Sequence, residues 1–407
     1  MKNARIDAIS NRWLLPEGVD EFLPPQAEAL ERLRRDLLDT FFSWGYELVI
    51  PPLIEYLESL LVGTGNDLDI ETFKLIDQST GRLLGVRADI TPQAARIDAH
   101  RLSRRGPVRL CYLDPVVHTR RSGFASSRNP IQVGGELYGH AGIESDIEVL
   151  RLMVRTLRVA GLDLFHVDLG HVGIFRALAR QAGLDAAQEA FLFEALQRKA
   201  KPEIESYLAG LAIEDRQRRR LISLVELNGG AGVLEEAHTL LKGAGKEVEA
   251  ALESLLQMAE AAQCQLATIK LHYDLAELRG YRYQSGVVFA AFAPGRGSEI
   301  ARGGRYDDIG RSFGRARPAT GFSTDLKTLL ALGARPAVSA KGIMAPAWSE
   351  DDGLRRLIRD LRGRGERVIY SLPDQETTAV EMGCDRMIER RDGRWVVVDA
   401  ANNAAGG

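Results

Sequence analysis

The sequence contains little cysteine, no long apolar run and no excess of either charge. Its three cysteines, Cys111, Cys264 and Cys384, are isolated and widely separated, which excludes a disulfide framework or a paired-cysteine zinc site and fits a reducing compartment. No stretch approaches the ~18 consecutive apolar residues that span a bilayer, and the first residues lack the apolar segment of a signal peptide. We therefore expect a cytoplasmic protein with no membrane contact, no metal site and no cofactor.

The charges are nearly balanced, since 53 lysines and arginines stand against 56 aspartates and glutamates, a net charge of −3. The chain therefore lacks the overall basic charge of a nucleic-acid-binding protein, and we expect no nucleic-acid partner. Basic runs at residues 101–105 and 216–220 are surrounded by acidic residues, which indicates solvated helix faces. With 407 residues, 45% of them hydrophobic, the chain can bury a large core and divide into two or three domains.

Apolar spacing predicts helices and strands in the first 170 residues. Apolar side chains recur every three or four positions over residues 27–41, which predicts a helix that ends at Gly45. Residues 46–50 then have a strand pattern that is closed by two prolines, which cannot extend a ladder. Further expected elements are a hairpin over residues 69–86, a helix that starts at Pro92, a helix over 146–160 and a strand over 165–169.

The composition changes in the middle of the chain. Between about residues 175 and 262, Glu, Ala, Leu, Arg and Gln dominate and β-branched residues become rare, which favours a helical insertion. Strand patterns return after residue 268, so residues 1–335 are expected to form one α+β core around this insertion. Residues 336–400 have a short α/β pattern that predicts a small C-terminal domain, and residues 401–407 are expected to be a disordered tail. In this domain we expect strands at 342–345, 368–371 and 395–398 and a helix at 353–364.

Five separated segments carry glycines and polar residues in a distinctive order. They are GVRADITP at residues 85–92, RNPIQVGGE at 128–136, LRGYRYQSGVVF at 278–289, GGRYD at 303–307 and ATGFSTDLKT at 319–328. In this order and with nearly gapless spacing, they resemble the catalytic core of histidyl-tRNA synthetase, over about residues 13–333. The resemblance implies an α+β fold of the class II aminoacyl-tRNA synthetase type: an antiparallel sheet flanked by helices, with a helical insertion and a small C-terminal α/β module.

The first segment resembles the family's Arg-Pro-Glu-Gly-Thr. By that resemblance, the carboxylate of Asp89 and the hydroxyl of Thr91 bind the α-ammonium group of histidine. Asp89 is one methylene shorter than the family's glutamate but offers the same acceptor. Taken alone, Asp89 and Thr91 would more often be helix N-capping residues ahead of Pro92, so their assignment depends on the other segments.

The second segment matches the family's Arg-Gln-Phe-His-Gln-(Leu/Phe)-Gly-x-Glu without a gap. By this resemblance Gln132 and Glu136 contact bound histidine, and Glu136 reaches toward its imidazole. An imidazole N–H in a closed pocket needs a strong acceptor, and charge-assisted hydrogen bonds are the strongest available. The alternative is a strand end whose polar residues face solvent, and the match over nine residues favours the binding site.

The third and fourth segments resemble two histidine-specific signatures of the same family. Arg279 matches an arginine near the substrate carboxylate, and Tyr283 matches the first of two pocket tyrosines, whereas Gln284 replaces the second. Without the resemblance, Arg279 could be a surface strand residue and the two glycines an ordinary turn. Paired glycines permit φ > 0 and close backbone approach at a pocket wall. The residues expected to line the pocket are Arg128, Tyr281, Gly303, Gly304, Arg305 and Tyr306.

The sequence departs from the family where the synthetase would bind ATP. The family's Phe-Arg-x-Glu is replaced at residues 117–120, so that His118 stands for an arginine that clamps the α-phosphate and Arg120 for a carboxylate that contacts adenine. In the last segment Thr328 replaces the second phosphate arginine. His118 cannot form the bidentate fork of a guanidinium, and each lost ionic hydrogen bond costs roughly 1.5–3 kcal/mol. Lys327 is a candidate compensating cation, although the helix turns it to another face.

A pocket kept for the amino acid without the ATP-binding groups indicates a sensor. The chain is therefore identified as a member of the histidyl-tRNA synthetase-like regulatory subunits of ATP phosphoribosyltransferase. This resemblance implies a non-catalytic chain that dimerises, joins the short-form catalytic subunit in a hetero-octamer, and responds to L-histidine as the feedback inhibitor. Two alternatives stay open: an active histidyl-tRNA synthetase, and a stand-alone histidine-binding paralogue with another partner.

Overall fold

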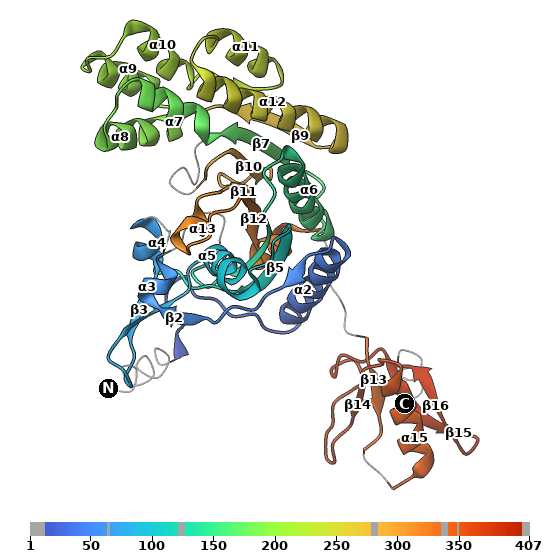
Figure 1. The fold of residues 1–407 in the computed structure, drawn as a ribbon. Coiled ribbons are helices and arrows are strands. Elements are labelled where there is room, and N and C mark those ends of the chain that lie inside the picture. The colour runs from blue at the N-terminus through green and yellow to red at the C-terminus, as the bar shows by residue number, and fades with distance from the viewer. Residues whose placement is uncertain are drawn as a thin grey trace, which may run out of the picture. The chain divides into compact units, whose positions relative to one another are not determined.

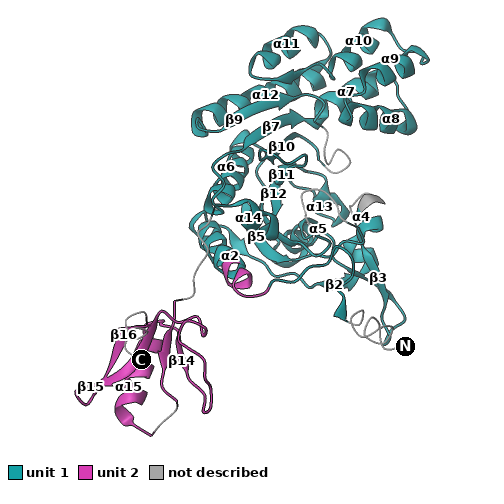
Figure 2. Ribbon diagram, turned by 180° about the vertical axis from the view of Figure 1, so that it is seen from behind, with its two compact units in different colours: residues 1–22, 30–335 teal, residues 23–29, 336–407 magenta. Residues whose placement is uncertain are grey.

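A computed structural model describes residues 13–62, 66–120, 127–277, 284–334, 341–347 and 350–400. The chain divides into two compact units: residues 1–22 with 30–335, and residues 23–29 with 336–407 (Figure 2). Each unit has a hydrophobic core of its own. None of the helices in these described ranges is long and apolar enough to cross a membrane.

A mixed sheet that is nine strands wide in the described residues forms the centre of the first unit (Figure 1). Adjacent strands are antiparallel, apart from parallel pairs at β1–β5 and β7–β9. In spatial order the strands are β1 (Glu47–Leu48), β5 (Val108–Pro115), β6 (Ile131–Tyr138), β12 (Ala319–Asp325), β11 (Ala301–Arg305), β10 (Val287–Phe292), β7 (His166–His171), β9 (Lys270–Asp274) and β8 (Asn228–Gly229).

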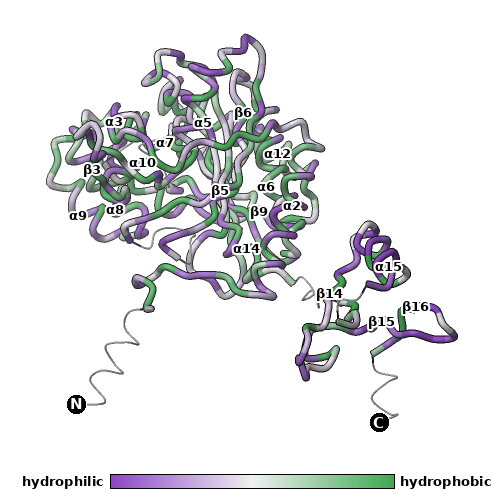
Figure 3. Tube along the Cα trace, turned by 90° about the horizontal axis from the view of Figure 1, so that it is seen from below, coloured by the Kyte–Doolittle hydropathy of each residue, from purple (hydrophilic) through white to green (hydrophobic). Residues whose placement is uncertain are grey.

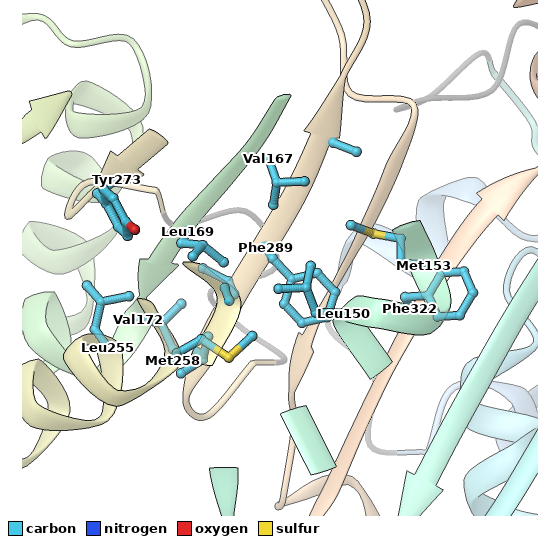
Figure 4. Close-up of a cluster of buried hydrophobic side chains, with 14 of the residues drawn as sticks. Leu150, Met153, Val167, Leu169, Val172, Leu255, Met258, Tyr273, Phe289 and Phe322 are labelled. Carbon is cyan, nitrogen blue, oxygen red and sulfur yellow. The ribbon is translucent and has the colours of Figure 1, made fainter. Parts of the chain in front are cut away.

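One face of this sheet carries the main hydrophobic core. Strand side chains alternate between the two faces, and Val133, Leu137 and Phe322 belong to the same buried cluster as the helices that cover this face. These helices include α2 (Gln26–Ser43), α6 (Ile143–Val159) and α12 (Lys246–Gln265). Figure 4 shows Leu150 and Met153 of α6 beside Phe289 and Phe322 of the sheet. Because the apolar residues point here, the polar residues between them must point to the opposite face.

Helices α5, η2 and α13 lie over the opposite face at its β5–β6–β12 end, where they share a second buried cluster with these strands. Their bounds are α5 (Thr91–Arg96), the π-helix η2 (Ile97–Leu102) and α13 (Ile309–Ser312), and α14 (Leu326–Leu332) directly follows β12. A three-stranded antiparallel sheet, β2 (Ile54–Tyr56), β4 (Leu83–Val86) and β3 (Phe73–Ile76), leads into α5 together with α3 (Leu57–Leu60) and α4 (Asn66–Glu71).

Six helices separate β7 from β9, with the two-residue strand β8 among them. They are α7 (Val172–Gln181), α8 (Ala186–Gln197), α9 (Lys201–Ala209), α10 (Asp215–Ser223), α11 (Gly232–Leu240) and α12. Local signals fix their ends; Asp185, for example, forms a capping box with Gln188 at the start of α8. The apolar faces of these helices continue the main core, since Leu255 and Met258 of α12 lie beside Leu169 of β7 (Figure 4).

In its described residues from 341 onward, the second unit has a four-stranded sheet and one helix. Its strand order is β14 (Val368–Tyr370), β13 (Ile343–Ala345), β15 (Arg386–Arg391) and β16 (Arg394–Asp399). Helix α15 (Asp352–Gly363) buries Leu354 and Ile358, packs Leu357 and Leu361 beside them, and is otherwise mostly hydrophilic (Figure 3). Strand β15 was not predicted, because its sequence RMIERR has no apolar alternation. Residues 401–407, the predicted tail, lie outside the described ranges.

The α+β architecture predicted from the sequence is confirmed. The hairpin of β3 and β4, helix α6 and strand β7 fall within a few residues of their predicted positions, and strands β9 and β10 follow residue 268, where strand patterns were expected to return. The strand expected at residues 46–50 is shorter than predicted, because only Glu47 and Leu48 pair with β5 before the two prolines interrupt the ladder.

Candidate functional site

The predicted binding residues of the second motif share one face of β6, opposite the main core. Gln132, Gly134 and Glu136 alternate with the core residues, and register places Gly321 of β12 directly beside Glu136. Tyr112 of β5 is paired with Gly134. The face therefore combines long polar side chains with glycines on the neighbouring positions.

The glycines provide the space that the polar side chains occupy. A methyl group on Gly321 would lie 1.5 Å from Glu136 Oε2, and one on Gly134 would lie 2.3 Å from the ring of Tyr112. Both distances are far inside van der Waals contact, so any larger residue would displace the carboxylate or the tyrosine ring. Glycine is thus required at these two positions because the side chains of Glu136 and Tyr112 lie against the backbone there, and not because the backbone makes a turn.

Glu136 is buried, and both its carboxylate oxygens accept hydrogen bonds from tyrosines. Tyr112 Oη donates to Oε1 at 2.9 Å, and Tyr306 Oη donates to Oε2. Thr91 Oγ1 lies 3.1 Å from Tyr112 Oη and extends this network to the start of α5. Burial raises the pKa of Glu136 to about 8, and the nearby charge of Asp89 contributes to the increase. The carboxyl of Glu136 therefore keeps its proton to a higher pH than an ordinary glutamate does.

Asp89 and Gln132 form a second polar group at the same site. Gln132 Nε2 donates to Asp89 Oδ1 at 2.8 Å, and Gln132 Oε1 accepts from the backbone N–H of Ile90 at 2.9 Å. Asp89 Oδ1 also accepts from the N–H of Thr91, whereas no described residue donates to Oδ2. The half-buried Asp89 thus has one carboxylate oxygen without a donor among the described residues, and neither Asp89 nor Glu136 has an ion-pair partner there.

Two parts of the fourth motif, its tyrosine Tyr306 and its paired glycines, lie beside Glu136 and its neighbours on β12. Tyr306 contacts Glu136, as described above, and Gly304 is paired with Gly321 in the sheet. A methyl group on Gly303 would lie 2.4 Å from the carbonyl oxygen of Gly321, so the strands β11 and β12 need glycine here. Arg305 is directed elsewhere: its guanidinium donates to Asp146 and to the carbonyl oxygens of His140 and Gly142.

Arg128 also forms its contacts away from Glu136. Its Nε donates to the carbonyl oxygen of His118 at 3.1 Å and its Nη1 to that of Glu17 at 3.0 Å. The neighbouring Asn129 exchanges two hydrogen bonds with the backbone of Asp20. These two residues hold the segment that precedes α2 against the end of β6. Arg279, Tyr281 and Tyr283, which the sequence also assigns to the pocket, lie outside the described residues.

The residues that replace the expected ATP-binding groups are bonded within the protein. His118 Nε2 lies 2.8 Å from the carbonyl oxygen of Ala88; a carbonyl can only accept, so Nε2 carries the hydrogen. Thr328 is fully buried and donates from both its backbone N–H and its hydroxyl to Asp325 Oδ2. Asp325 thereby caps α14. Arg120 is exposed.

Lys327 is a cation with a partner. Its Nζ donates to Asp20, and the ring of Phe22 lies 5.4 Å away. The lysine side chain is 6% exposed and that of Asp20 is 43% exposed, so the buried ammonium is paired with a carboxylate that lies at the surface. Sequence analysis could not foresee this pairing, because residues 13–22 carry no periodic pattern that would place Asp20 near α14. Tyr112 was likewise missed, since an aromatic residue within the apolar run LCYL is typical of a core strand.

The fold and these motifs define a histidyl-tRNA synthetase-like protein of the class II type. The family pattern of histidyl-tRNA synthetase matches residues 18–329, and that of the C-terminal domain of the ATP phosphoribosyltransferase subunit HisZ matches residues 340–398. A histidyl-tRNA synthetase structure from Nostoc sp. PCC 7120 has a TM-score of 0.74 at 18% identity and covers 97% of this chain and 98% of its own, which shows the shared fold.

Two further relatives narrow the assignment. A solved ATP phosphoribosyltransferase regulatory subunit/histidyl-tRNA synthetase from Bacillus halodurans has a TM-score of 0.81 at 27% identity, with 92% of this chain and 97% of that chain covered. An ATP phosphoribosyltransferase regulatory subunit from Thioalkalivibrio sulfidiphilus is 59% identical over 392 residues, which are 96% of this chain and 99% of the relative. The chain belongs to the family of ATP phosphoribosyltransferase regulatory subunits.

Proposed function

We propose that the polar face around Glu136 binds L-histidine and that this binding regulates ATP phosphoribosyltransferase. As a member of the regulatory subunit family, the chain has a non-catalytic role in histidine biosynthesis and works with a catalytic partner subunit. The observation that supports the ligand is the pair of neighbouring acidic groups, Asp89 and Glu136, which have no cation beside them in the part of the chain that the structure describes. Two such groups favour a ligand that carries more than one nitrogen donor.

The two carboxylates have different environments that suit the two ends of histidine. Asp89 is half-buried, and no described residue donates to its Oδ2. This oxygen can therefore accept a hydrogen bond from an α-ammonium group. Glu136 is fully buried and is bonded to two tyrosines, so only a ligand group that fits a closed polar space can reach it. We assign the ammonium group to Asp89, Thr91 and Gln132, and the imidazole to Glu136. We also assign Arg279 and Tyr283 to this pocket, and this assignment depends on the sequence motif alone.

The contacts of the residues at the expected ATP-binding positions support our proposal that the chain has no synthetase activity. We propose that His118, Arg120 and Thr328 are positions where the ATP-binding groups have been lost. The hydrogen bonds of Thr328 to Asp325 support this assignment, because a group that is satisfied internally gains little by contacting a phosphate. His118 uses Nε2 in its bond to Ala88, and its buried Nδ1 has no partner among the described residues. The pairing of Lys327 with Asp20 argues against the compensating cation that the sequence left open.

We also propose that the chain dimerises and joins its short-form catalytic partner in a hetero-octamer. Exposed apolar side chains at the end of α2 and after it support self-association, since Phe42 is 82% and Ile50 72% exposed and such groups are buried in stable interfaces. Native mass spectrometry of the chain alone should then show a dimer. With the catalytic chain added it should show four copies of each, and a different stoichiometry would contradict this assembly.

Titration of the purified chain with L-histidine tests the ligand. Calorimetry should detect one site, and repetition with ATP and magnesium should give no heat and no pyrophosphate. An active histidyl-tRNA synthetase would instead show histidine-dependent exchange of pyrophosphate into ATP. A stand-alone histidine-binding paralogue would bind histidine and leave the catalytic chain of ATP phosphoribosyltransferase unaffected.

A further inference from the structure

A basic hollow lies in the helical insertion, far along the chain from the histidine-binding motifs. It has a volume of about 550 Å³ and is formed by α10 together with the end of α11 and the turn that leads into α12. Figure 1 shows these three helices as neighbours in the insertion. Four cationic side chains and two hydroxyl groups line it: Arg216, Arg219, Arg220, Lys242, Ser223 and Thr239.

Two of the guanidinium groups are held side by side. Arg220 Nη2 donates to the carbonyl oxygen of Lys242 at 2.7 Å, and Arg216 Nη2 donates to the same oxygen at 3.3 Å. The sequence indicated a solvated helix face for this run, yet Arg220 is buried. Burial, together with the charge of Arg216, lowers the pKa of Arg220. Like charges placed this close repel each other, so the arrangement is stabilised when an anion enters.

No carboxylate offsets this charge. None of the four cations forms an ion pair within the described part of the chain, and no acidic residue lines the hollow. Nearby carboxylates are engaged elsewhere: Asp215 pairs with Arg218 at 2.5 Å, and Glu247 pairs with Arg180 at 2.8 Å. The hollow is thus an unneutralised cationic site inside a protein whose net charge is negative.

We propose that this hollow binds a small molecule through two or more linked phosphate groups. Guanidinium forks match pairs of phosphate oxygens, and one phosphate monoester carries only about −1.5 to −2 charges, so four cations match a diphosphate or triphosphate better. The volume lies in the range of small-molecule sites, and the half-exposed Leu240 adds an apolar wall for the rest of the ligand. The proposal does not depend on the histidine site.

A small ligand fits the surroundings better than a nucleic-acid backbone does. A backbone groove needs cations along a continuous track, whereas other basic residues of the insertion are neutralised in ion pairs. Arg198 pairs with Glu203, and Lys201 pairs with Glu226. The unpaired charge is therefore concentrated at the hollow.

Calorimetric titration of the full chain at low ionic strength with sodium triphosphate, diphosphate and phosphate tests this proposal. We expect triphosphate and diphosphate to bind at least tenfold more tightly than phosphate. The double variant Arg216→Gln/Arg219→Gln, at two exposed positions, should weaken triphosphate binding at least tenfold. The matched control Arg180→Gln/Arg198→Gln removes the same charge from exposed, paired residues of the insertion and should change the affinity less than twofold.

Several outcomes would overturn the proposal. These are equal binding of all three anions, equal losses in the two double variants, or unchanged affinity in Arg216→Gln/Arg219→Gln. Binding of an RNA hairpin that requires Arg216 and Arg219 and is not displaced by triphosphate would assign the surface to nucleic acid instead. A parallel titration with ATP shows which part of the ligand the hollow recognises. Equal affinity for ATP and triphosphate supports a site that contacts only the phosphates, and tighter ATP binding supports a site that also contacts the nucleoside. Unchanged histidine binding in each variant shows that the fold is intact.

Discussion

Two groups of polar residues near strand β6 differ in what they are bonded to. Asp89 and Glu136 have no cation beside them among the described residues, and no described residue donates to Asp89 Oδ2. Thr328, in contrast, donates from both its backbone N–H and its hydroxyl to Asp325, and His118 Nε2 donates to the carbonyl oxygen of Ala88. The proposed binding residues thus leave acceptor atoms available, whereas the residues at the expected ATP-binding positions use donors within the protein.

The largest expected effect concerns the proton on Glu136. Its pKa is about 8 in the folded protein against 4.5 for an ordinary glutamate, so the folded state binds the extra proton between these values. The free energy of unfolding should then fall as pH rises from about 4.5 to 8, by up to about 1.4 kcal/mol per pH unit from this group. Glu136→Gln should lack this component. Urea denaturation of both proteins across that pH range measures the difference, and parallel curves would contradict it.

Replacement of Glu136 should also weaken histidine binding more than any other single change at the site. In the proposed complex the imidazole favours the ionised form of Glu136, and loss of a hydrogen bond to a charged group costs about 1.5–3 kcal/mol. Glu136→Gln should therefore lower the affinity roughly 10- to 100-fold by calorimetry. The control Glu144→Gln changes an exposed carboxylate at the start of α6 and should bind like the unmodified chain. If Glu136→Gln bound histidine as tightly as Glu144→Gln does, Glu136 would not be part of the histidine site.

A smaller effect is expected from the tyrosine beside that carboxylate. Tyr306→Phe removes one neutral donor to Glu136 and should weaken histidine binding about 2- to 10-fold. The variant Tyr207→Phe, in the helical insertion, serves as its control. A loss as large as that of Glu136→Gln would show that Tyr306 contacts the ligand directly rather than through the glutamate.

The smallest effect is expected at the positions where a synthetase would bind ATP. His118→Arg introduces one guanidinium, but Thr328 and the paired Lys327 remain, so ATP–pyrophosphate exchange should stay at background with or without histidine. Recovery of exchange in this variant would mean that one arginine alone, and not the internal bonding of Thr328 and Lys327, separates this chain from an enzyme.

Sequence motifs predicted the polar residues of the proposed site but not the residues that support them. Asp89, Gln132 and Glu136 were assigned from motifs, and the structure brings Asp89 and Gln132 into direct contact across 43 positions of sequence; their role in binding stays a prediction. Tyr112 was not assigned, because its role depends on the cross-strand neighbour Gly134 that leaves room for its ring. Arg305 was assigned to the pocket, yet its hydrogen bonds go to residues 140–146.

The general lesson is that alternation and motifs specify which face a strand residue occupies, but not which distant segment meets it. Asp20 precedes α2 in a stretch without helical or strand periodicity, and its pairing with Lys327 spans 307 positions. Such a pair is set by tertiary packing, which the local sequence does not encode. Strand β15 shows the same limit, since its neighbours in the sheet supply the pairing that its own charged sequence does not indicate.

The burial of Thr328 limits what this position can hold. The hydroxyl and backbone of this residue are bonded to Asp325 at a position with no solvent exposure. An arginine there would have to place a long charged side chain in closely packed space, which costs stability whether or not a nucleotide is bound. A synthetase-like phosphate site therefore cannot be built at this position by one substitution, since the packing around residue 328 would have to change with it.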